Sequence, residues 1–204
     1  MVDGQRLNDP AISGAGETVP KYPLINIARV ELIRGPGAAV YGSNAMLGVI
    51  NIITRREINK VTASVGSLNR RKLSILASHS TDDVKIDFFG HFDADNGDHY
   101  RVQDTFSSDL ITTDDPRELA DFSLKFKWKQ TQVNLQHNQY KADNFYELDS
   151  ISNDFNARSS QLTSISLQHN VNWQAVSSWF WLSYNRSKFN TKSQLTAPGD
   201  LTTG

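Results

Sequence analysis

Alternation of apolar and polar residues runs through most of the chain from about residue 60 onward, and it limits the fold more than any other feature of the sequence. Over residues 121–129 the two kinds of position alternate without a break: Phe122, Leu124, Phe126 and Trp128 against Ser123, Lys125, Lys127 and Lys129. Successive side chains of a β-strand point to opposite faces, whereas an α-helix repeats every 3.6 residues. The pattern therefore predicts strands with one apolar and one polar face.

Similar patterns predict about seven strands, at roughly residues 60–66, 71–80, 84–95, 121–129, 132–146, 159–173 and 176–190. Their connections alternate in length. Residues 96–119 and 148–157 form long polar connections, whereas the turns near Lys129–Thr131 and Trp173–Ala175 are tight. An up-and-down β-barrel has this arrangement when one rim carries long loops and the other short turns.

Alternation alone also fits an amphipathic antiparallel sheet of a soluble protein. Two features favour a lipid-facing sheet instead. The polar faces are charged and rich in amides, as in a wet barrel interior, and the apolar faces carry aromatic residues typical of lipid interfaces. We assign to the apolar faces Phe88, Phe92, Phe122, Phe126, Trp128, Trp173, Trp179 and Trp181.

The bulk composition excludes several classes of function. With 204 residues and a net charge of −1, the chain has no electrostatic case for binding nucleic acid. It contains no cysteine, which excludes disulfides, thiolate metal sites and a cysteine nucleophile. No window approaches the roughly 18 apolar residues of a membrane helix, and "MVDGQRLNDP" lacks the apolar core of a signal peptide. A transmembrane β-barrel stays possible, because its membrane signal is the alternation itself.

Residues 30–56, "VELIRGPGAAVYGSNAMLGVINIITRR", place two glycine clusters between two apolar runs. A phosphate-binding loop fits poorly, because the spacing of Gly35, Gly37 and Gly42 is not G-x-G-x-x-G and Pro36 has no N–H group to donate. Tight turns explain the glycines better. We therefore expect "ARVELI" and "GVINII" to pair in a small sheet, and we place a domain boundary at residues 56–60, where the composition changes.

"VDGQRLND" and the long stretch from Ile25 to Arg56 closely resemble the later part of the plug domain of TonB-dependent outer-membrane receptors. The matching positions are Ile27, Arg29, Val30, Glu31, Ile33, Arg34, Gly35, Pro36, Tyr41, Gly42, Ala45, Gly48, Val49, Ile50, Asn51, Ile52, Ile53 and Thr54. By this resemblance residues 1–56 are the C-terminal part of a small mixed α/β plug domain. Residues 57–204 are then the first seven or so strands of a transmembrane β-barrel that has 22 strands in the family.

The resemblance implies transport rather than catalysis. The plug lies inside the barrel, ligands bind at its outer apices and the extracellular loops, and TonB pulls on the N-terminus of the plug. The implied partners are TonB, outer-membrane lipid and a scarce small ligand such as a siderophore–metal chelate or cobalamin. The ligand itself is not specified, because its determinants lie on loops and apices that vary within the family.

The resemblance also assigns roles to residues. Charge contacts between plug and barrel wall are expected at Arg29, Glu31 and Arg34, since charges buried between the two with little water need partners; a solvated charged strand face is the other interpretation. A structural role in the plug motif is expected for Arg34, Gly35, Pro36, Gly37, Tyr41, Gly42, Asn44, Gly48 and Asn51.

The chain departs from the family in lacking a signal peptide, a TonB box and the first plug strands. About seven strands cannot close a barrel, and open edges in hydrocarbon would leave backbone groups unpaired at several kcal/mol each. We therefore interpret the chain as a fragment of an outer-membrane protein.

No other chemistry is indicated. "HFDADNGDH", from His91 to His99, superficially resembles a calcium loop but lacks the flanking helices and the bidentate glutamate. An acidic loop after a strand is the simpler interpretation, with weak cation binding left open. No spacing supports a catalytic triad or a carboxylate pair, so we expect no enzyme, no cofactor and no metal site.

Three hypotheses follow. The first is a fragment of a TonB-dependent receptor for active ligand uptake. The second is a soluble or non-transporting β-sheet binding or structural protein derived from such a gene. The third, a nucleotide-dependent enzyme, would require phosphate binding at residues 35–42.

Overall fold

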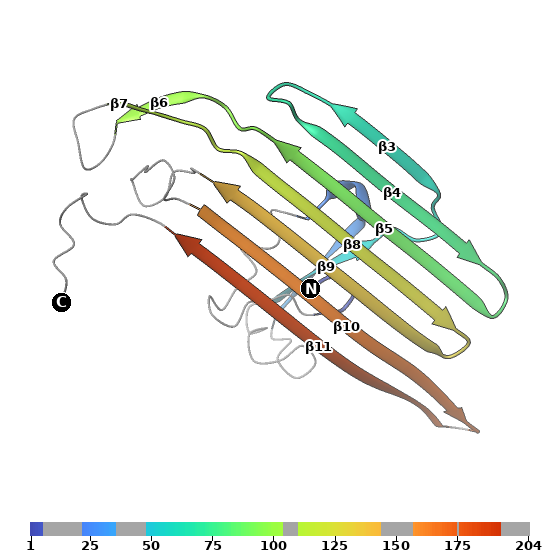
Figure 1. The fold of residues 1–204 in the computed structure, drawn as a ribbon. Coiled ribbons are helices and arrows are strands. Elements are labelled where there is room, and N and C mark those ends of the chain that lie inside the picture. The colour runs from blue at the N-terminus through green and yellow to red at the C-terminus, as the bar shows by residue number, and fades with distance from the viewer. Residues whose placement is uncertain (6–21, 36–47, 104–109, 144–156, 175, 193–204) are drawn as a thin grey trace, which may run out of the picture.

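The computed structural model describes residues 1–5, 22–35, 48–103, 110–143, 157–174 and 176–192. Its main element is a seven-stranded antiparallel sheet in the order β11-β10-β9-β8-β5-β4-β3 (Figure 1). The strands are β3 (Lys60–Val65), β4 (Arg71–Ser80), β5 (Val84–Asp95), β8 (Arg117–Trp128), β9 (Thr131–Asp143), β10 (Ala157–Trp173) and β11 (Val176–Lys192). Neighbours in the sheet follow one another along the chain, with only β6 and β7 inserted, so the sheet is an up-and-down meander.

All seven strands predicted from alternation are confirmed. Three of them start earlier than predicted, at Arg117, Thr131 and Ala157, because pairing with neighbouring strands extends them beyond the alternating residues. The connection predicted as a long polar stretch contains a further two-stranded sheet, made by β6 (Tyr100–Gln103) and β7 (Leu110–Thr113). These strands lie at the end of the sheet that carries the long connections (Figure 1).

The predicted pairing of "ARVELI" with "GVINII" is confirmed by β1 (Ile27–Arg34) and β2 (Gly48–Thr54), which form a two-stranded antiparallel sheet. A short 3₁₀ helix, η2 (Leu24–Asn26), precedes β1, and Val2 bridges in parallel to Ile52 of β2. We call residues 1–5, 22–35 and 48–54 the N-terminal unit. Within the described ranges, no helix is long and apolar enough to cross a membrane.

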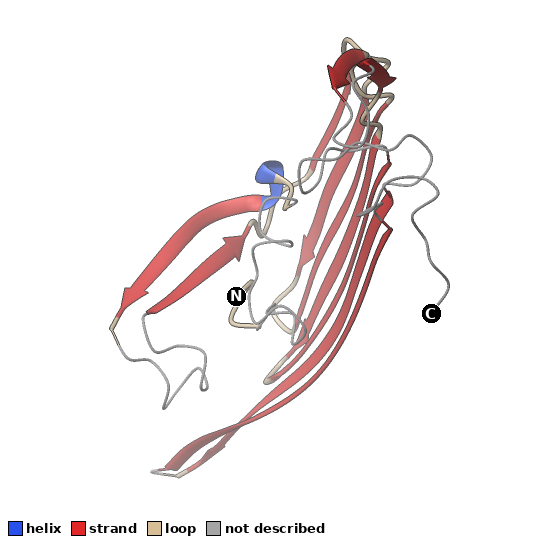
Figure 2. Ribbon diagram, turned by 90° about the vertical axis from the view of Figure 1, so that its left-hand side faces the viewer, coloured by secondary structure: helices blue, strands red, loops and turns tan. Residues whose placement is uncertain are grey.

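The N-terminal unit lies on one side of the seven-stranded sheet, which curves around it (Figure 2). We call that side the inner face and the opposite side the outer face. Most of the buried inner-face residues are polar: Ser74, Asp121, Ser123, Lys125, Gln136, Asn138, Ser164 and Ser166. Leu76, Phe89, Ala142 and Leu162 are apolar exceptions.

The outer face carries large apolar side chains in contact with solvent. Their positions follow from the strand register, because paired residues on neighbouring strands share a face. They include Val61, Leu73, Phe92, Phe122, Phe126, Trp128, Ile165, Leu167, Trp173, Phe180, Leu182 and Tyr184. A sheet that buries polar residues and exposes apolar ones inverts the usual arrangement of a water-soluble protein.

Two aromatic residues lie on a different face from the one predicted. Trp181 pairs with Gln168 and Trp179 with Asn170, on the same side as buried Ser164 and Ser166. Both tryptophans therefore lie on the inner face. The run "SSWFWLSYNR" is apolar at successive positions, so its sequence could not distinguish the two faces, and only the register with β10 does so.

Candidate functional site

The N-terminal unit is bound to the inner face through a buried ion pair. Lys125 Nζ of β8 lies 2.6 Å from Asp3 Oδ2, and the two side chains are only 11% and 10% exposed. Lys125 Nζ also donates a hydrogen bond to Thr54 Oγ1. Thr54, at the end of β2, in turn donates its backbone N–H and its hydroxyl to the Asp3 carboxylate, at 3.1 and 2.8 Å. Lys125 of the sheet thus contacts both the beginning of the unit, at Asp3, and its end, at Thr54.

A tight turn aims Asp3 at this contact. Val2 and Gln5 exchange backbone hydrogen bonds, and the two residues between them, Asp3 and Gly4, have φ angles of 48° and 81°. Asp-Gly is the residue pair that such left-handed turns favour. The side chain of Gln5, beyond the turn, donates a 2.9 Å hydrogen bond to Asn185 of β11. The turn therefore connects the unit to two separate strands of the sheet.

Tyr22 makes a second buried contact. Its side chain packs with Val2, Ile52 and Leu162 in an apolar cluster that spans the unit and β10. Gln136 of β9 donates a 2.7 Å hydrogen bond to the Tyr22 hydroxyl oxygen. Burial raises the pKa of Tyr22 well above its ordinary value, and the carboxylates of Asp121 and Asp3 raise it further, against the hydrogen bond from Gln136. Tyr22 is therefore a neutral, fixed anchor at physiological pH.

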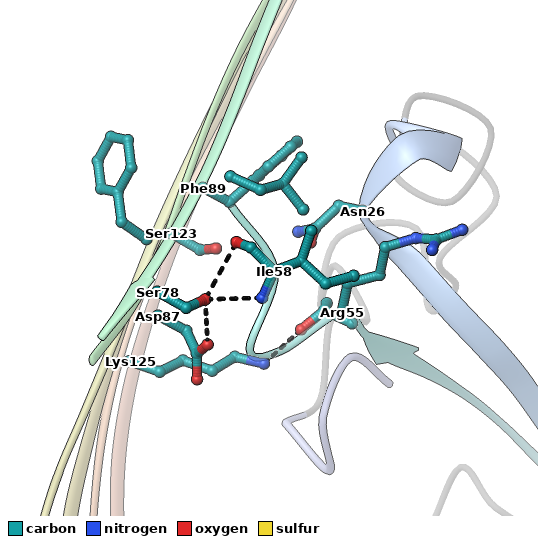
Figure 3. A pocket seen from close by; sticks show the side chains of 11 residues that line it. Asn26, Arg55, Ile58, Ser78, Asp87, Phe89, Ser123 and Lys125 are labelled. Carbon is teal, nitrogen blue, oxygen red and sulfur yellow. Dashed lines mark hydrogen bonds between the residues drawn. The ribbon is translucent and has the colours of Figure 1, made fainter. Parts of the chain in front are cut away.

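The segment that leaves the unit is also bonded to the sheet, around Ser78 (Figure 3). The Ser78 hydroxyl accepts a hydrogen bond from Ile58 N at 3.1 Å and donates one to Asp87 at 2.7 Å. Asp87 also accepts the Glu57 N–H at 2.8 Å. Figure 3 shows Lys125 reaching from β8 toward the same segment. The connection between β2 and β3 is therefore held in place by residues of β4 and β5.

Arg29 and Glu31, two of the three charged residues expected to contact the barrel wall, have contacts within the N-terminal unit. Arg29 pairs with Glu31 on the same strand at 2.7 Å, and their side chains are 64% and 37% exposed. Asn51 donates to Glu31 at 3.2 Å and accepts the Gly4 N–H at 3.1 Å, which ties β2 to the Asp3 turn. Arg34 is exposed. A contact of these charges with further parts of a barrel stays a prediction.

Two motif glycines, Gly35 just after β1 and Gly48 at the start of β2, have positive φ angles, which favour glycine. Gly35 has φ +97° and Gly48 has φ +148°. A Cβ on Gly48 would lie 2.6 Å from the carbonyl oxygen of Ile33 on the paired strand. Five positions of the predicted motif lie outside the described residues: Pro36, Gly37, Tyr41, Gly42 and Asn44. Most of residues 35–42, on which the phosphate-loop hypothesis depends, also lies outside them.

Gly48→Ala is expected to destabilise the β1–β2 pair by about 1–3 kcal/mol, because it forces a side chain into a strained backbone and against a carbonyl oxygen. Hydrogen exchange of the β1 and β2 amides measures this loss. Gly66→Ala is the matched control, since its Cβ would meet only the Arg70 side chain at an ordinary 3.7 Å. Equal exchange rates in the two variants would contradict the assignment.

A cavity of about 540 Å³, lined by both apolar and charged side chains, lies between the segment of Tyr22 to Ile25 and the inner face. Its acidic lining is already paired: Asp93 contacts Arg70 at 2.9 Å and Lys72 at 3.1 Å. Arg70 has a raised pKa because it donates a hydrogen bond to Asp93. Among the described residues, no group of three or more side chains has the arrangement of a metal site.

The residues that carry the contact between the unit and the sheet were missed in the sequence, with one partial exception. Asp3 lies in "VDGQRLND", which supported the resemblance, but nothing there pointed to a charge partner. Lys125 is one of three lysines in the alternating sequence of residues 121–129, and the pattern does not single it out. Only the fold brings Asp3, Thr54 and Lys125 together.

Comparison with known proteins agrees with this arrangement. Residues 1–49 match the family model of the TonB-dependent receptor plug domain. A mutant of the ferric enterobactin receptor PfeA of Pseudomonas aeruginosa has a similar fold, with a TM-score of 0.60 at 19% identity over 93% of this chain and 32% of that chain. A second mutant of the same receptor gives a TM-score of 0.60 at 20% identity, over 92% of this chain and 32% of that one.

The ferric-catecholate import receptor Fiu of E. coli K12 also resembles the chain, with a TM-score of 0.50 at 16% identity over 82% of this chain and 29% of the receptor. At these identities the likeness concerns the fold alone. The chain spans about a third of the length of these structures. The resemblance to a TonB-dependent receptor fragment, a plug segment followed by an open antiparallel sheet, is confirmed.

Proposed function

We propose that the chain is the part of an outer-membrane receptor in which the plug meets the first barrel strands, and that the whole receptor takes up a scarce ligand without catalysis. In this proposal residues 1–56 belong to the plug and residues 57–204 to the barrel. TonB supplies the energy from the inner membrane.

One observation carries the proposal: the sheet is polar where it is buried and apolar where it is exposed. Lipid on the outer face would cover the exposed side chains, and a polar plug inside a wet barrel would match the inner face. The buried Asp3–Lys125 ion pair and the Tyr22–Gln136 hydrogen bond fit such an interior, because both join the N-terminal unit to the wall.

The ligand class we favour is a ferric chelate of the siderophore type. The names of the structurally similar receptors, which concern ferric enterobactin and ferric catecholate, support this choice. Cobalamin is the second candidate. The cavity beside Tyr22 offers both positive and negative side chains and therefore does not discriminate between these ligands.

The test uses the full-length protein that contains this segment. We expect it to refold into detergent micelles or lipid vesicles and to aggregate in their absence. In cells we expect uptake of radioactive iron as a ferric catecholate, and loss of that uptake when TonB is deleted. Uptake of labelled cyanocobalamin instead would change the ligand class and leave the transport proposal intact.

The rival is a soluble or non-transporting β-sheet protein that uses its aromatic face to bind a partner. It predicts a monomeric protein that unfolds cooperatively in water without detergent. That result, with no TonB-dependent uptake of either probe, would overturn the proposed function.

A further inference from the structure

The strand cations of the outer face lie at one end of the sheet. By the strand register, five outer-face positions of the described strands carry lysine or arginine. All five lie toward the end with the long connections: Arg71, Lys141, Arg186, Lys188 and Lys192. The opposite end of the same face carries Trp128 and Trp173. The outer face is therefore asymmetric along the strands.

Three of these cations lie near one another on β9 and β11, the two strands that flank β10, and we call Lys141, Arg186 and Lys188 the basic patch. Arg186 and Lys188 are two residues apart on β11, about 7 Å along the strand. Lys141 lies on β9, two strands away and one step further along, about 12 Å from Lys188. All three side chains are exposed.

The residues between the three cations are neutral and polar. On β10, Thr163 pairs with Arg186 and Gln161 pairs with Lys188, and Gln139 of β9 pairs with Gln161. Amide and hydroxyl groups between cations supply further hydrogen-bond donors for an oxygen-rich anion.

Two carboxylates share this part of the outer face. Glu118 lies 3.9 Å from Lys141, with side chains 48% and 50% exposed, and such exposed pairs are weak. Asp143 lies in one row with Lys192, through their common partner Ala157. The basic patch together with Lys192 therefore keeps an excess of positive charge.

The patch directly follows the apolar part of the same strands. Tyr184 and Leu182 precede Arg186 on the outer face of β11, and Ile165 and Leu167 lie beside them on β10. Long basic side chains lay their apolar stems on such a surface and extend their charged ends to the level of lipid headgroups. On the proposed function, which this inference rests on, the patch lies where hydrocarbon gives way to headgroups on the side of the long loops.

We propose that the basic patch binds the phosphate group of a lipid headgroup in the leaflet on the side of the long loops. Arg186 and Lys188 contact the oxygens of one phosphate group, and Lys141 contacts the same headgroup from β9. A lipid satisfies both parts of the surface, because its chains cover Leu182 and Tyr184 while its phosphate meets the cations. A free phosphate ion would gain nothing from the apolar part.

The test measures lipid binding to the full-length protein in neutral detergent by native mass spectrometry. The probe is a diphosphorylated lipid A glycolipid, and its enzymatically dephosphorylated form is the comparison. We expect the triple variant Lys141→Gln, Arg186→Gln and Lys188→Gln to bind the phosphorylated lipid at least about tenfold more weakly than the wild type. The dephosphorylated lipid should bind the wild type as weakly as the phosphorylated lipid binds this variant.

The matched control removes three charges away from the outer-face patch: Lys60→Gln, Lys127→Gln and Lys129→Gln. This control variant should bind the phosphorylated lipid with an affinity within about twofold of the wild type, because the position of the cations, not the net charge of the protein, determines binding. Equal binding by the triple variant and the wild type, an equal loss in the control, or displacement of the lipid by inorganic phosphate alone would overturn the proposal. If the wild type inserts into vesicles in such a case, the proposed function stands; if it does not insert, both fail.

Discussion

Replacing Lys125 by methionine is expected to loosen the N-terminal unit from the sheet by about 3–5 kcal/mol, the usual cost of removing one partner of a buried ion pair. The Asp3 carboxylate, only 10% exposed, would keep its hydrogen bonds to Thr54 but lose its cation. Methionine fills a similar volume, so the loss would reflect charge rather than a cavity. The measurement is hydrogen exchange of residues 1–5 and 48–54 in the full-length protein.

Lys127→Met is the control for this experiment. Lys127 lies two residues along the same strand and on the same face, but its side chain is exposed. Lys127→Met should leave the hydrogen-exchange rates of residues 1–5 and 48–54 unchanged. The double variant Asp3→Asn with Lys125→Met should recover much of the stability, since no unpaired charge is then buried. Equal effects of Lys125→Met and Lys127→Met would show that the buried pair does not hold the unit.

Leu182→Arg is expected to lower the stability of the full-length protein in lipid vesicles by about 2–4 kcal/mol if the outer face meets the middle of a bilayer. Leu182 is 70% exposed and lies on the outer face opposite Leu167. Its neighbour Ser183 is also exposed but points to the inner face. Ser183→Arg is therefore the matched control, and it should be tolerated.

The measurement is reversible urea unfolding in vesicles, followed by tryptophan fluorescence. In a soluble sheet the outer face is in water, where an arginine at an exposed position is close to neutral. That alternative predicts that Leu182→Arg costs no more stability than Ser183→Arg. Identical unfolding midpoints for the two arginine variants would therefore count against lipid on the outer face.

The strands were predictable because each lies between two unlike environments. The alternation of Phe122 to Lys129 reports those environments directly, and β8 is found where it was predicted except for its first residues. Arg117 begins the strand without any alternation, and its place is set by pairing with Asp95 and Ala142. Where the two faces were both apolar, as at Trp179 and Trp181, periodicity could not assign a face.

The candidate site was much less predictable. The motif positions Gly48 and Asn51 follow from the family pattern, and their roles are local: Gly48 accommodates the Ile33 carbonyl and Asn51 holds the Asp3 turn. Lys125 and Gln136, by contrast, are joined to the N-terminal unit only by the fold. No short-range pattern relates Asp3, near the start of the chain, to Lys125, beyond its middle.

The meander described above has a consequence for the order of folding. Each strand of the large sheet pairs with a neighbour close in sequence, so hairpins can form with short loop closure. The N-terminal unit precedes its partners Lys125, Gln136 and Asn185 along the chain, and these lie on β8, β9 and β11. Its attachment must therefore wait until those strands exist. We expect this attachment to be a late step, although the N-terminal unit precedes the sheet along the chain.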